Sequence, residues 1–247
     1  MIEPSIHYRL ADYASLSRSD VVLDVGAGLG FLTRFLAGMC KRVLAVESDS
    51  RLVKILRDQL EDLSNVEVIE GNVLKVSTLH FDKVVSIPPY HISSPLLLWL
   101  FGKRFDRGVL IFQKEFANRL VAPVGSENYG WLTVVTYYYA EVGLLDDVPK
   151  WMFYPQPEVD SVIVRLKSKK SPPFDLKNKV LFKQLVQALF TRRNRKVKNA
   201  VTHFLKRTQT TAAKNMVETA KSLAFQDRRV RELAPEDFGA LANALDR

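Results

Sequence analysis

An apolar run that ends in three alternating glycines is the part of this sequence best suited to bind a ligand. The run Val21–Val25 leads into Gly26, Gly28 and Gly30, and a second apolar run about twenty residues later ends in Glu47. Glycines at this spacing let the backbone approach a ligand closely and leave the N-terminus of the next helix open. A carboxylate at the next strand tip can accept hydrogen bonds from both hydroxyls of a ribose. Together these features predict a pocket for a nucleoside cofactor.

The spacing of the glycines indicates which cofactor this is. Dinucleotide-binding turns read G-x-G-x-x-G, whereas this turn reads Asp24-x-Gly26-x-Gly28-x-Gly30. That form resembles motif I of S-adenosylmethionine-dependent methyltransferases, which have no pyrophosphate to cradle. In such a site Asp24 would face the methionine ammonium group, and the glycines would make room for the sulfonium end. A nicotinamide-dependent dehydrogenase is the alternative, and the glycine spacing disfavours it.

A proline-rich turn after the fourth apolar run is the candidate reacting centre, and it reads Ser86-Ile87-Pro88-Pro89-Tyr90. Ligands in open α/β sheets bind beyond the carboxyl ends of the strands, so Tyr90 is expected beside the sulfonium. Its ring would offer a flat face for a base pulled out of its helix. Phe153 lies in a second proline-rich segment and is the second stacking candidate. The alternative is that both rings are core residues braced by prolines.

The alternation of apolar runs with helical patterns predicts the fold that must position these residues. It favours βαβ units and an α/β fold with a mostly parallel sheet covered on both faces. Two later runs, 132–139 and 161–166, are also expected to be strands, pairing antiparallel at one edge. The five strands expected in the first half are 21–25, 43–47, 66–70, 83–87 and 108–112.

A linker rich in lysine, serine and proline at 167–173 marks a domain boundary. Beyond it, apolar residues between 197 and 205 follow the spacing of an amphipathic helix. We therefore expect a catalytic domain at 1–168 and a small, basic, all-helical domain at 174–247.

The net charge of +9 is concentrated at the C-terminal end. Residues 168–247 hold 18 Lys and Arg against 7 Asp and Glu, whereas the first 167 residues hold 18 against 20. This asymmetry indicates a polyanionic partner, with solvated helix faces as the alternative. The densest run supplies the residues expected to contact RNA phosphates, which are Arg192, Arg193, Arg195 and Lys196.

Other features exclude several classes of function. The single cysteine, Cys40, rules out an intramolecular disulfide and fits a reducing compartment. No apolar stretch approaches membrane-spanning length and no signal segment is recognisable, so a cytoplasmic protein is expected. The four histidines lie far apart without metal-ligand spacing, so no metal site is expected.

A series of segments in one order resembles the ribosomal small-subunit RNA adenine N6-dimethyltransferase family (KsgA-type), in particular its archaeal members. The similarity runs from about residue 8 to the C-terminus. The segments are 24–30, 47–49, 92–95, 113–117, 153–161, 190–193 and 233–238.

The resemblance implies a Rossmann-like methyltransferase domain that uses S-adenosylmethionine. The reaction it implies is methylation of N6 on two adjacent adenines in small-subunit ribosomal RNA, during ribosome biogenesis. The reacting base would lie against Ile87, Pro88, Pro89, Tyr90 and Phe153. Lys114 and Arg119 are candidates to line the RNA approach, with local ion pairs as the alternative. The implied cofactor contacts are Asp24, Gly26, Gly28, Gly30, Glu47, Ser48, Asn72, Val73 and Ser86.

Three positions depart from the family pattern. Family members carry Asn-x-Pro-Tyr where this chain places Ile87, and isoleucine cannot accept a hydrogen bond from N6. The carbonyl of Pro88 remains as an acceptor, and Ser86 would serve only if the loop shifted by one residue. Asn72 replaces the usual aspartate after the third strand, although its oxygen can still accept from the cofactor's adenine amine. The family's N-terminal Gln-x-Phe-Leu segment has no clear match in residues 1–8.

Two classes of function therefore remain. As an enzyme, the protein would methylate ribosomal RNA adenines, slowly or only once per base. As an assembly factor that has lost methylation, it would bind the pre-ribosomal small subunit through its basic tail. The retained glycines and aromatic residues favour the enzyme, and the tail motifs disfavour another nucleic acid or a protein as substrate. We expect a monomer, because each basic face must be free for RNA.

Overall fold

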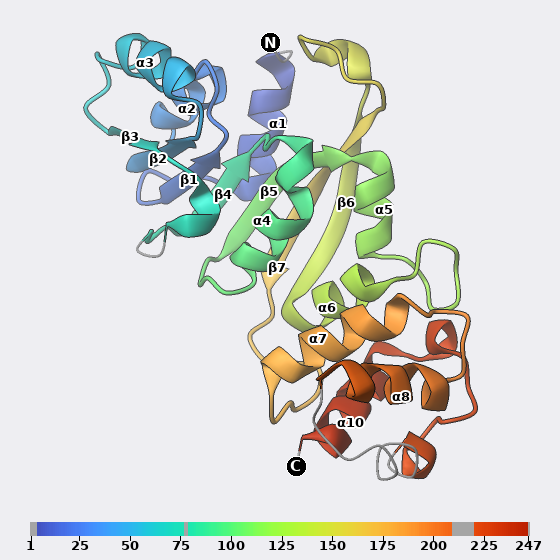
Figure 1. The fold of residues 1–247 in the computed structure, drawn as a ribbon. Helices are drawn as coiled ribbons and strands as arrows, with labels where there is room; N and C mark the ends of the chain where they lie inside the picture. The colour runs from blue at the N-terminus through green and yellow to red at the C-terminus, as the bar shows by residue number, and fades with distance from the viewer. Residues whose placement is uncertain (1–3, 77–78, 209–219, 247) are drawn as a thin grey trace. The chain divides into compact units, whose positions relative to one another are not determined.

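The computed structural model describes residues 4–76, 79–208 and 220–246. The chain divides into two compact units (Figure 1). The first comprises Met1–Ala117 and Ala140–Ser168, and the second comprises Asn118–Tyr139 and Lys169–Arg247. The predicted first domain, 1–168, is therefore wrong for residues 118–139, which pack within the helical unit.

The first unit is built on a seven-stranded sheet with the order β3-β2-β1-β4-β5-β7-β6. The five strands from β3 to β5 are parallel, and β7 pairs antiparallel with both β5 and β6. This confirms the five strands predicted for the first half and the antiparallel role of 161–166. The strands are β1 (Val21–Val25), β2 (Arg42–Glu47), β3 (Val66–Glu70), β4 (Lys83–Ser86), β5 (Arg107–Gln113), β6 (Ala140–Val148) and β7 (Ser161–Ser168).

Helices cover both faces of this sheet because its central strands are apolar on both sides. Val22 and Leu23 point to opposite faces, and both are fully buried. One face packs against α1 and α2, and α4 lies on the other (Figure 1). The helices of this unit are α1 (Pro4–Ala14), α2 (Phe31–Ala37), α3 (Ser50–Gln59) and α4 (Ser93–Leu100), with short 3-10 turns η1 (Val73–Lys75), η2 (Tyr90–Ile92) and η3 (Lys150–Met152).

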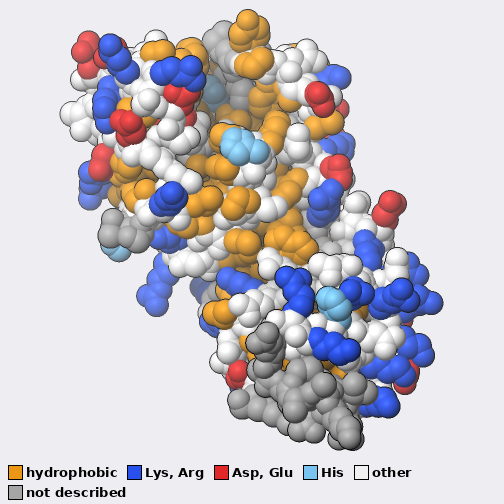
Figure 2. Space-filling view, in the orientation of Figure 1, with side chains coloured by type: hydrophobic (Ala, Val, Ile, Leu, Met, Phe, Trp, Pro, Cys, Tyr) orange, Lys and Arg blue, Asp and Glu red, His pale blue; other side chains and the backbone are white. Residues whose placement is uncertain are grey.

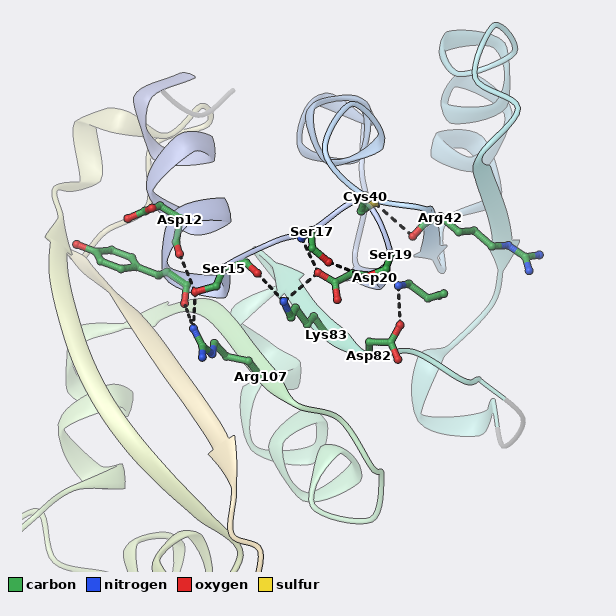
Figure 3. A network of polar contacts seen from close by, with 12 residues as sticks. Asp12, Ser15, Ser17, Ser19, Asp20, Cys40, Arg42, Asp82, Lys83 and Arg107 are labelled. Carbon is green, nitrogen blue, oxygen red and sulfur yellow. Dashed lines mark hydrogen bonds and ion pairs between the residues drawn. The ribbon is translucent and has the colours of Figure 1, made fainter.

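A buried ion pair fastens the C-terminal end of α1 to the sheet (Figure 3). The ammonium group of Lys83 donates to the carboxylate of Asp20 at 2.9 Å and to the carbonyl of Ser15 at 2.6 Å. Arg107 donates to the carbonyl of Tyr13 and to the hydroxyl of Ser15. Burial tends to raise the pKa of Asp20, but the hydrogen bond from Lys83 holds it below its ordinary value. Removing one partner of such a pair leaves an uncompensated buried charge, which typically costs about 3–5 kcal/mol.

The segment 132–139 was predicted to be a strand, and this is wrong: it forms α6 (Trp131–Tyr139). Its β-branched and aromatic residues favour strands locally, but such propensities yield to tertiary packing. Tyr138 lies 5.0 Å from Phe174 and 5.5 Å from Phe182, between ring centroids. Thr133 donates from its side chain to the carbonyl of Arg119 at 2.6 Å. The helix thus buries six of its nine residues in the second unit.

The true edge strand is β6, which the sequence pattern did not predict. It contains Gly143, Asp146 and Asp147, which belong to types depleted in strands. The β6–β7 register also shifts between Leu144 and Asp147, as at a bulge. Acidic residues and bulges are common on edge strands because they discourage pairing with other chains.

The second unit is helical, as predicted for the tail. Asn178 caps α7 by accepting from the backbone N–H groups of Val180 and Leu181. The predicted amphipathic helix over 197–205 is confirmed as α8, which buries Val197, Ala200, Val201, Phe204 and Leu205. The helices of this unit are α6, α7 (Lys179–Phe190), α8 (Val197–Thr208), the 3-10 turn η4 (Val230–Glu232) and α10 (Pro235–Leu245), while α5 (Lys114–Leu120) bridges the unit boundary.

Candidate active site

A cavity of about 370 Å³ opens at the carboxyl ends of the parallel strands. The glycine turn after β1 forms one wall, the turn after β4 contributes Ile87, and the β6–β7 loop contributes Phe153. The lining residues are His7, Asp24, Gly26, Ala27, Gly28, Leu29, Phe31, Leu32, Ile87, Phe153, Tyr154 and Pro155.

Asp24 is the buried acid of this cavity. It is 1% exposed and accepts a hydrogen bond from the hydroxyl of Thr33 at 2.8 Å. Burial raises its pKa to about 7, against the hydrogen bonds from Thr33 and Ser86 and with a small addition from the charge of Glu47. A carboxyl group held in this way favours a positively charged ligand, which would restore the ionised form.

Glu47 organises the glycine turn as well as offering a carboxylate. One oxygen accepts from the backbone N–H of Gly28 at 3.0 Å. The other accepts from the N–H groups of Ser48 and Asp49 at 2.7 and 2.9 Å. Because a carboxylate has about four acceptor positions, Glu47 keeps capacity for a ligand hydroxyl.

The glycine turn and the proline turn after β4 approach each other closely. Gly26 has a φ of +73°, and a Cβ built there would lie 2.6 Å from Cδ of Pro89. Gly28 and Gly30 also have positive φ values, at +58° and +83°. All three glycines are therefore required by backbone conformation, and Gly26 is also required by its neighbour.

The structure brings Ile87 into the cavity and turns Ser86 away from it. Ser86 is fully buried, donates to the carbonyl of Val25 at 2.7 Å and accepts from the N–H of Val25 at 3.0 Å. Ser86 thus joins β4 to β1 and does not line the cavity, and its role as a cofactor contact stays a prediction. Ile87 lines the cavity, and its equivalence to the family's asparagine stays a prediction from the resemblance.

The two predicted stacking aromatics occupy different places. Phe153 lines the cavity and packs with Ile87 against the core under α1 and α2. Tyr90 is half-buried, does not line the cavity, and shares a hydrogen bond of 2.7 Å with Ser161. Burial raises the pKa of Tyr90. This hydrogen bond joins the proline turn to the start of β7, while Pro89 of the same turn lies against Gly26.

The predicted contacts after β3 lie at the same sheet edge but outside the cavity lining. Asn72 is exposed, and its side-chain oxygen accepts from the N–H of Leu74 at 2.9 Å, which caps η1. Val73 is buried at the start of this turn. The N–H of Gly71 donates to the carbonyl of Glu47 at 2.8 Å, which connects this turn to the end of β2.

Lys114 and Arg119, the candidates for the RNA approach, both lie on α5. Lys114 forms an exposed ion pair with Asp147 at 2.8 Å, and this hydrogen bond raises the pKa of Lys114. The alternative of local pairing therefore holds for Lys114. Arg119 belongs to the second unit.

In the basic run of the second unit, some charged side chains are exposed and others form hydrogen bonds or ion pairs within the protein. Arg193 donates to the carbonyls of Ser126 and Glu127 at 2.8 and 2.7 Å, so it holds a neighbouring loop. Lys196 pairs with Asp227 at 3.2 Å. Arg192 and Arg195 have exposed side chains. On the face drawn in Figure 2, Lys and Arg gather over this helical unit.

Sequence reasoning missed several side chains of the cavity. His7 comes from α1, is nearly buried beside Phe35, and has its pKa lowered by burial. No motif surrounds it, so nothing in the sequence signalled its position. Tyr154 directly follows Phe153 in the proline-rich segment, and that adjacency was an available signal. In the described part of the chain, no group of three or more His, Cys, Asp or Glu residues is placed to hold a metal ion.

Comparison with known proteins agrees with this geometry. A family model described as ribosomal RNA adenine dimethylase matches residues 1–235. A probable ribosomal RNA small subunit methyltransferase A from Methanosarcina acetivorans is 40% identical over 237 residues, which are 96% of this chain and 87% of the relative. Its counterpart from Thermococcus onnurineus is also 40% identical, over 96% of this chain and 86% of that protein.

Solved structures of the same kind cover both units. A dimethyladenosine transferase from Plasmodium falciparum has a TM-score of 0.81 and 30% identity, over 98% of this chain and 95% of that one. The 23S rRNA methyltransferase ErmE has a TM-score of 0.70 and 25% identity, over 99% and 98%. The chain therefore belongs to the ribosomal RNA adenine dimethylase family, whose members are S-adenosylmethionine-dependent methyltransferases.

Proposed function

We propose that this protein transfers methyl groups from S-adenosylmethionine to N6 of adenines, two adjacent ones, in small-subunit ribosomal RNA. The observation that carries the proposal is the single cavity shared by Asp24, the glycine turn, Ile87 and Phe153. It offers an acid for a cationic cofactor and an aromatic wall for a base in one open cavity. The curated relatives named small subunit methyltransferases supply the class of RNA.

The residues present fit S-adenosylmethionine. Asp24 is a buried acid whose ionised form lacks a cationic partner in the described protein, and it would hold the ammonium group. A Cβ on Gly28 would meet only the carbonyl of Gly26, at 3.9 Å, so this turn leaves room for a ligand. Glu47 would accept from the ribose hydroxyls, and Asn72 would accept from the adenine amine. When bound, the cofactor supplies an activated methyl group.

The chain's own residues must hold the target adenine and its amine. Phe153 would stack on the flipped base, because a flat ring recognises the face of an unstacked purine. The carbonyl of Pro88 would accept one hydrogen from N6, which stabilises the charge that develops on nitrogen. No strong base is required, since the alkylated nitrogen is acidic enough to lose its proton to water.

A second candidate function follows from Ile87. Its apolar side chain lines the cavity. If it occupies the position of the family's asparagine, as the resemblance implies, the methylation rate would be reduced or lost for want of that acceptor. The protein would then act as an assembly factor that binds the pre-ribosomal small subunit through its basic unit. The exposed side chains of Arg192 and Arg195 would contact phosphates in either case.

We also infer a monomer that works in the cytoplasm. The single buried cysteine fits a reducing compartment. Among the described residues, no helix is long and apolar enough to cross a membrane.

Unmethylated small subunits and S-adenosylmethionine with a labelled methyl group test the two functions directly. The enzyme is expected to label the RNA at adenine N6, with digestion and mass spectrometry separating mono- from dimethyladenine. Subunit binding without label above that of a heat-inactivated control would instead establish the assembly factor. Label in another RNA or in protein, with none in small-subunit RNA, would contradict both.

The pKa of Asp24 predicts that cofactor binding depends on pH. Protonated Asp24 must lose its proton before it can pair with an ammonium group, so affinity should fall as pH drops below about 7. Between pH 7 and 5.5 we expect a loss of about tenfold or more by calorimetry. The α-amino group of the ligand stays mostly protonated over this range.

The variant Asp24→Asn is the control for this pH dependence. It should bind more weakly at pH 7 and lose most of the dependence. His7 faces the same cavity, and its protonation would also repel a cation at low pH. A pH dependence that persists unchanged in Asp24→Asn would assign the effect to His7 instead.

A further inference from the structure

The loop between β6 and β7 exposes two large aromatic side chains, one of which, Tyr154, lines the cavity. Tyr154 is 83% exposed and Trp151 is 65% exposed. Between them in sequence, Met152 and Phe153 turn inward and pack against the core. Exposed aromatic surface that the fold could have buried marks a site of interaction when it lies next to a pocket.

This loop is held firmly at its base, so the two rings are presented from a defined backbone. The N–H of Lys150 donates to the carboxylate of Asp160 at 2.9 Å. Within η3, the N–H of Met152 donates to the carbonyl of Pro149 at 3.0 Å. Prolines 149, 155 and 157 further restrict the backbone. A preorganised loop loses little conformational entropy when it binds a ligand.

Tyr154 and its neighbour Pro155 are themselves part of the cavity wall. Two more exposed apolar residues, Leu29 and Phe31, line the same cavity from the glycine turn and α2, at 43% and 46% exposure. Among the described residues, the lining contains no Lys or Arg. The contacts that these residues offer at the opening are therefore mainly apolar and stacking ones.

We propose that Tyr154 and Trp151 form a stacking platform for the unpaired nucleotides that flank the target adenine. The proposal rests on the proposed function, because it takes the cavity to be the site of the flipped base. A nucleotide joined to that base must leave the cavity through its opening, where Tyr154 lies. Every base offers a flat face to such a ring, whereas a paired A-form helix keeps its base faces stacked inside.

Substitution of Tyr154 tests the platform through the split between KM and kcat. With a single-stranded RNA that carries flanking nucleotides, Tyr154→Ala should raise KM about tenfold, the loss typical of one stacked base. The value of kcat should change much less, and Tyr154→Phe should restore KM because it keeps the ring. Ile55→Ala, which removes an exposed apolar side chain from α3, should leave KM unchanged. An unchanged KM in Tyr154→Ala overturns the proposal.

Fluorescence of Trp151 gives a readout that does not need catalysis. Titration with the same RNA should quench the emission of the wild-type protein more than that of Trp151→Leu. A fully paired RNA of the same sequence should produce no such difference. Equal quenching by paired RNA, or none by single-stranded RNA at saturation, would overturn the platform and point to another partner for these rings. If the wild type binds RNA and quenches but transfers no methyl group, the proposed enzymatic function fails while the platform stands.

Discussion

Replacing Ile87 with asparagine is expected to raise the rate of methyl transfer about a hundredfold to a thousandfold. Ile87 lines the cavity together with Phe153, at the position where the family carries an asparagine. An amide oxygen there would accept a hydrogen from adenine N6 as positive charge develops on the nitrogen. One such preorganised group is typically worth about 3–4 kcal/mol of transition-state stabilisation. Single-turnover rates with saturating RNA and cofactor would measure the gain.

The variant Ile87→Val is the matched control, because it alters packing without adding an acceptor. We expect it to transfer methyl groups no faster than the wild type. Since Ile87 packs against the core, thermal unfolding of both variants should be recorded so that a loss of folded protein is not mistaken for slow chemistry. A folded Ile87→Asn protein with an unchanged rate would show that another group already supplies the acceptor.

The parallel half of the fold was predictable because its signals are local. Buried parallel strands such as β1 and β2 are continuous apolar runs, and glycines end the first of them. The segment of α6 has the same local appearance, yet it folds as a helix because Tyr138 packs among Phe174 and Phe182. Strand β6 is the opposite case. Its two aspartates disfavour a strand locally, yet the segment forms a strand because it pairs with β7. The periodicity of apolar residues along the sequence does not reveal such long-range packing.

Some residues of the candidate site were likewise predictable from the sequence, and others were not. Asp24, the glycine turn and Glu47 were predictable because strand order brings adjacent strand tips together. The hydrogen bond from Ser86 to Val25 was not predictable, because the direction of one side chain at the end of β4 cannot be read from the sequence. His7 comes from a helix far from any motif, and it lies at the cavity because α1 packs on the sheet through Ile6 and Leu10.

Replacing Gly26 with alanine is expected to weaken S-adenosylmethionine binding and to slow methyl transfer, the latter on the order of a hundredfold. The new Cβ would lie 2.6 Å from Cδ of Pro89, and the φ of +73° already disfavours any side chain. Pro89 is held in a rigid turn, so the clash must push the glycine turn or the proline turn out of place. Displacements of about 1 Å near a reacting centre typically cost about a hundredfold in activity. Calorimetry on the purified variant would measure the affinity.

The control variant Gly125→Ala distinguishes the effect of the clash with Pro89 from the effect of backbone strain. Gly125 has a φ of +83°, and a Cβ there would meet nothing within 4 Å. It should lose about 1–2 kcal/mol of folding free energy from the left-handed backbone alone and keep its cofactor affinity. If Gly26→Ala loses stability by a similar amount but binds the cofactor normally, the contact between the two turns does not shape the site. If it loses affinity while Gly125→Ala does not, the close approach of Gly26 to Pro89 sets the geometry of the pocket.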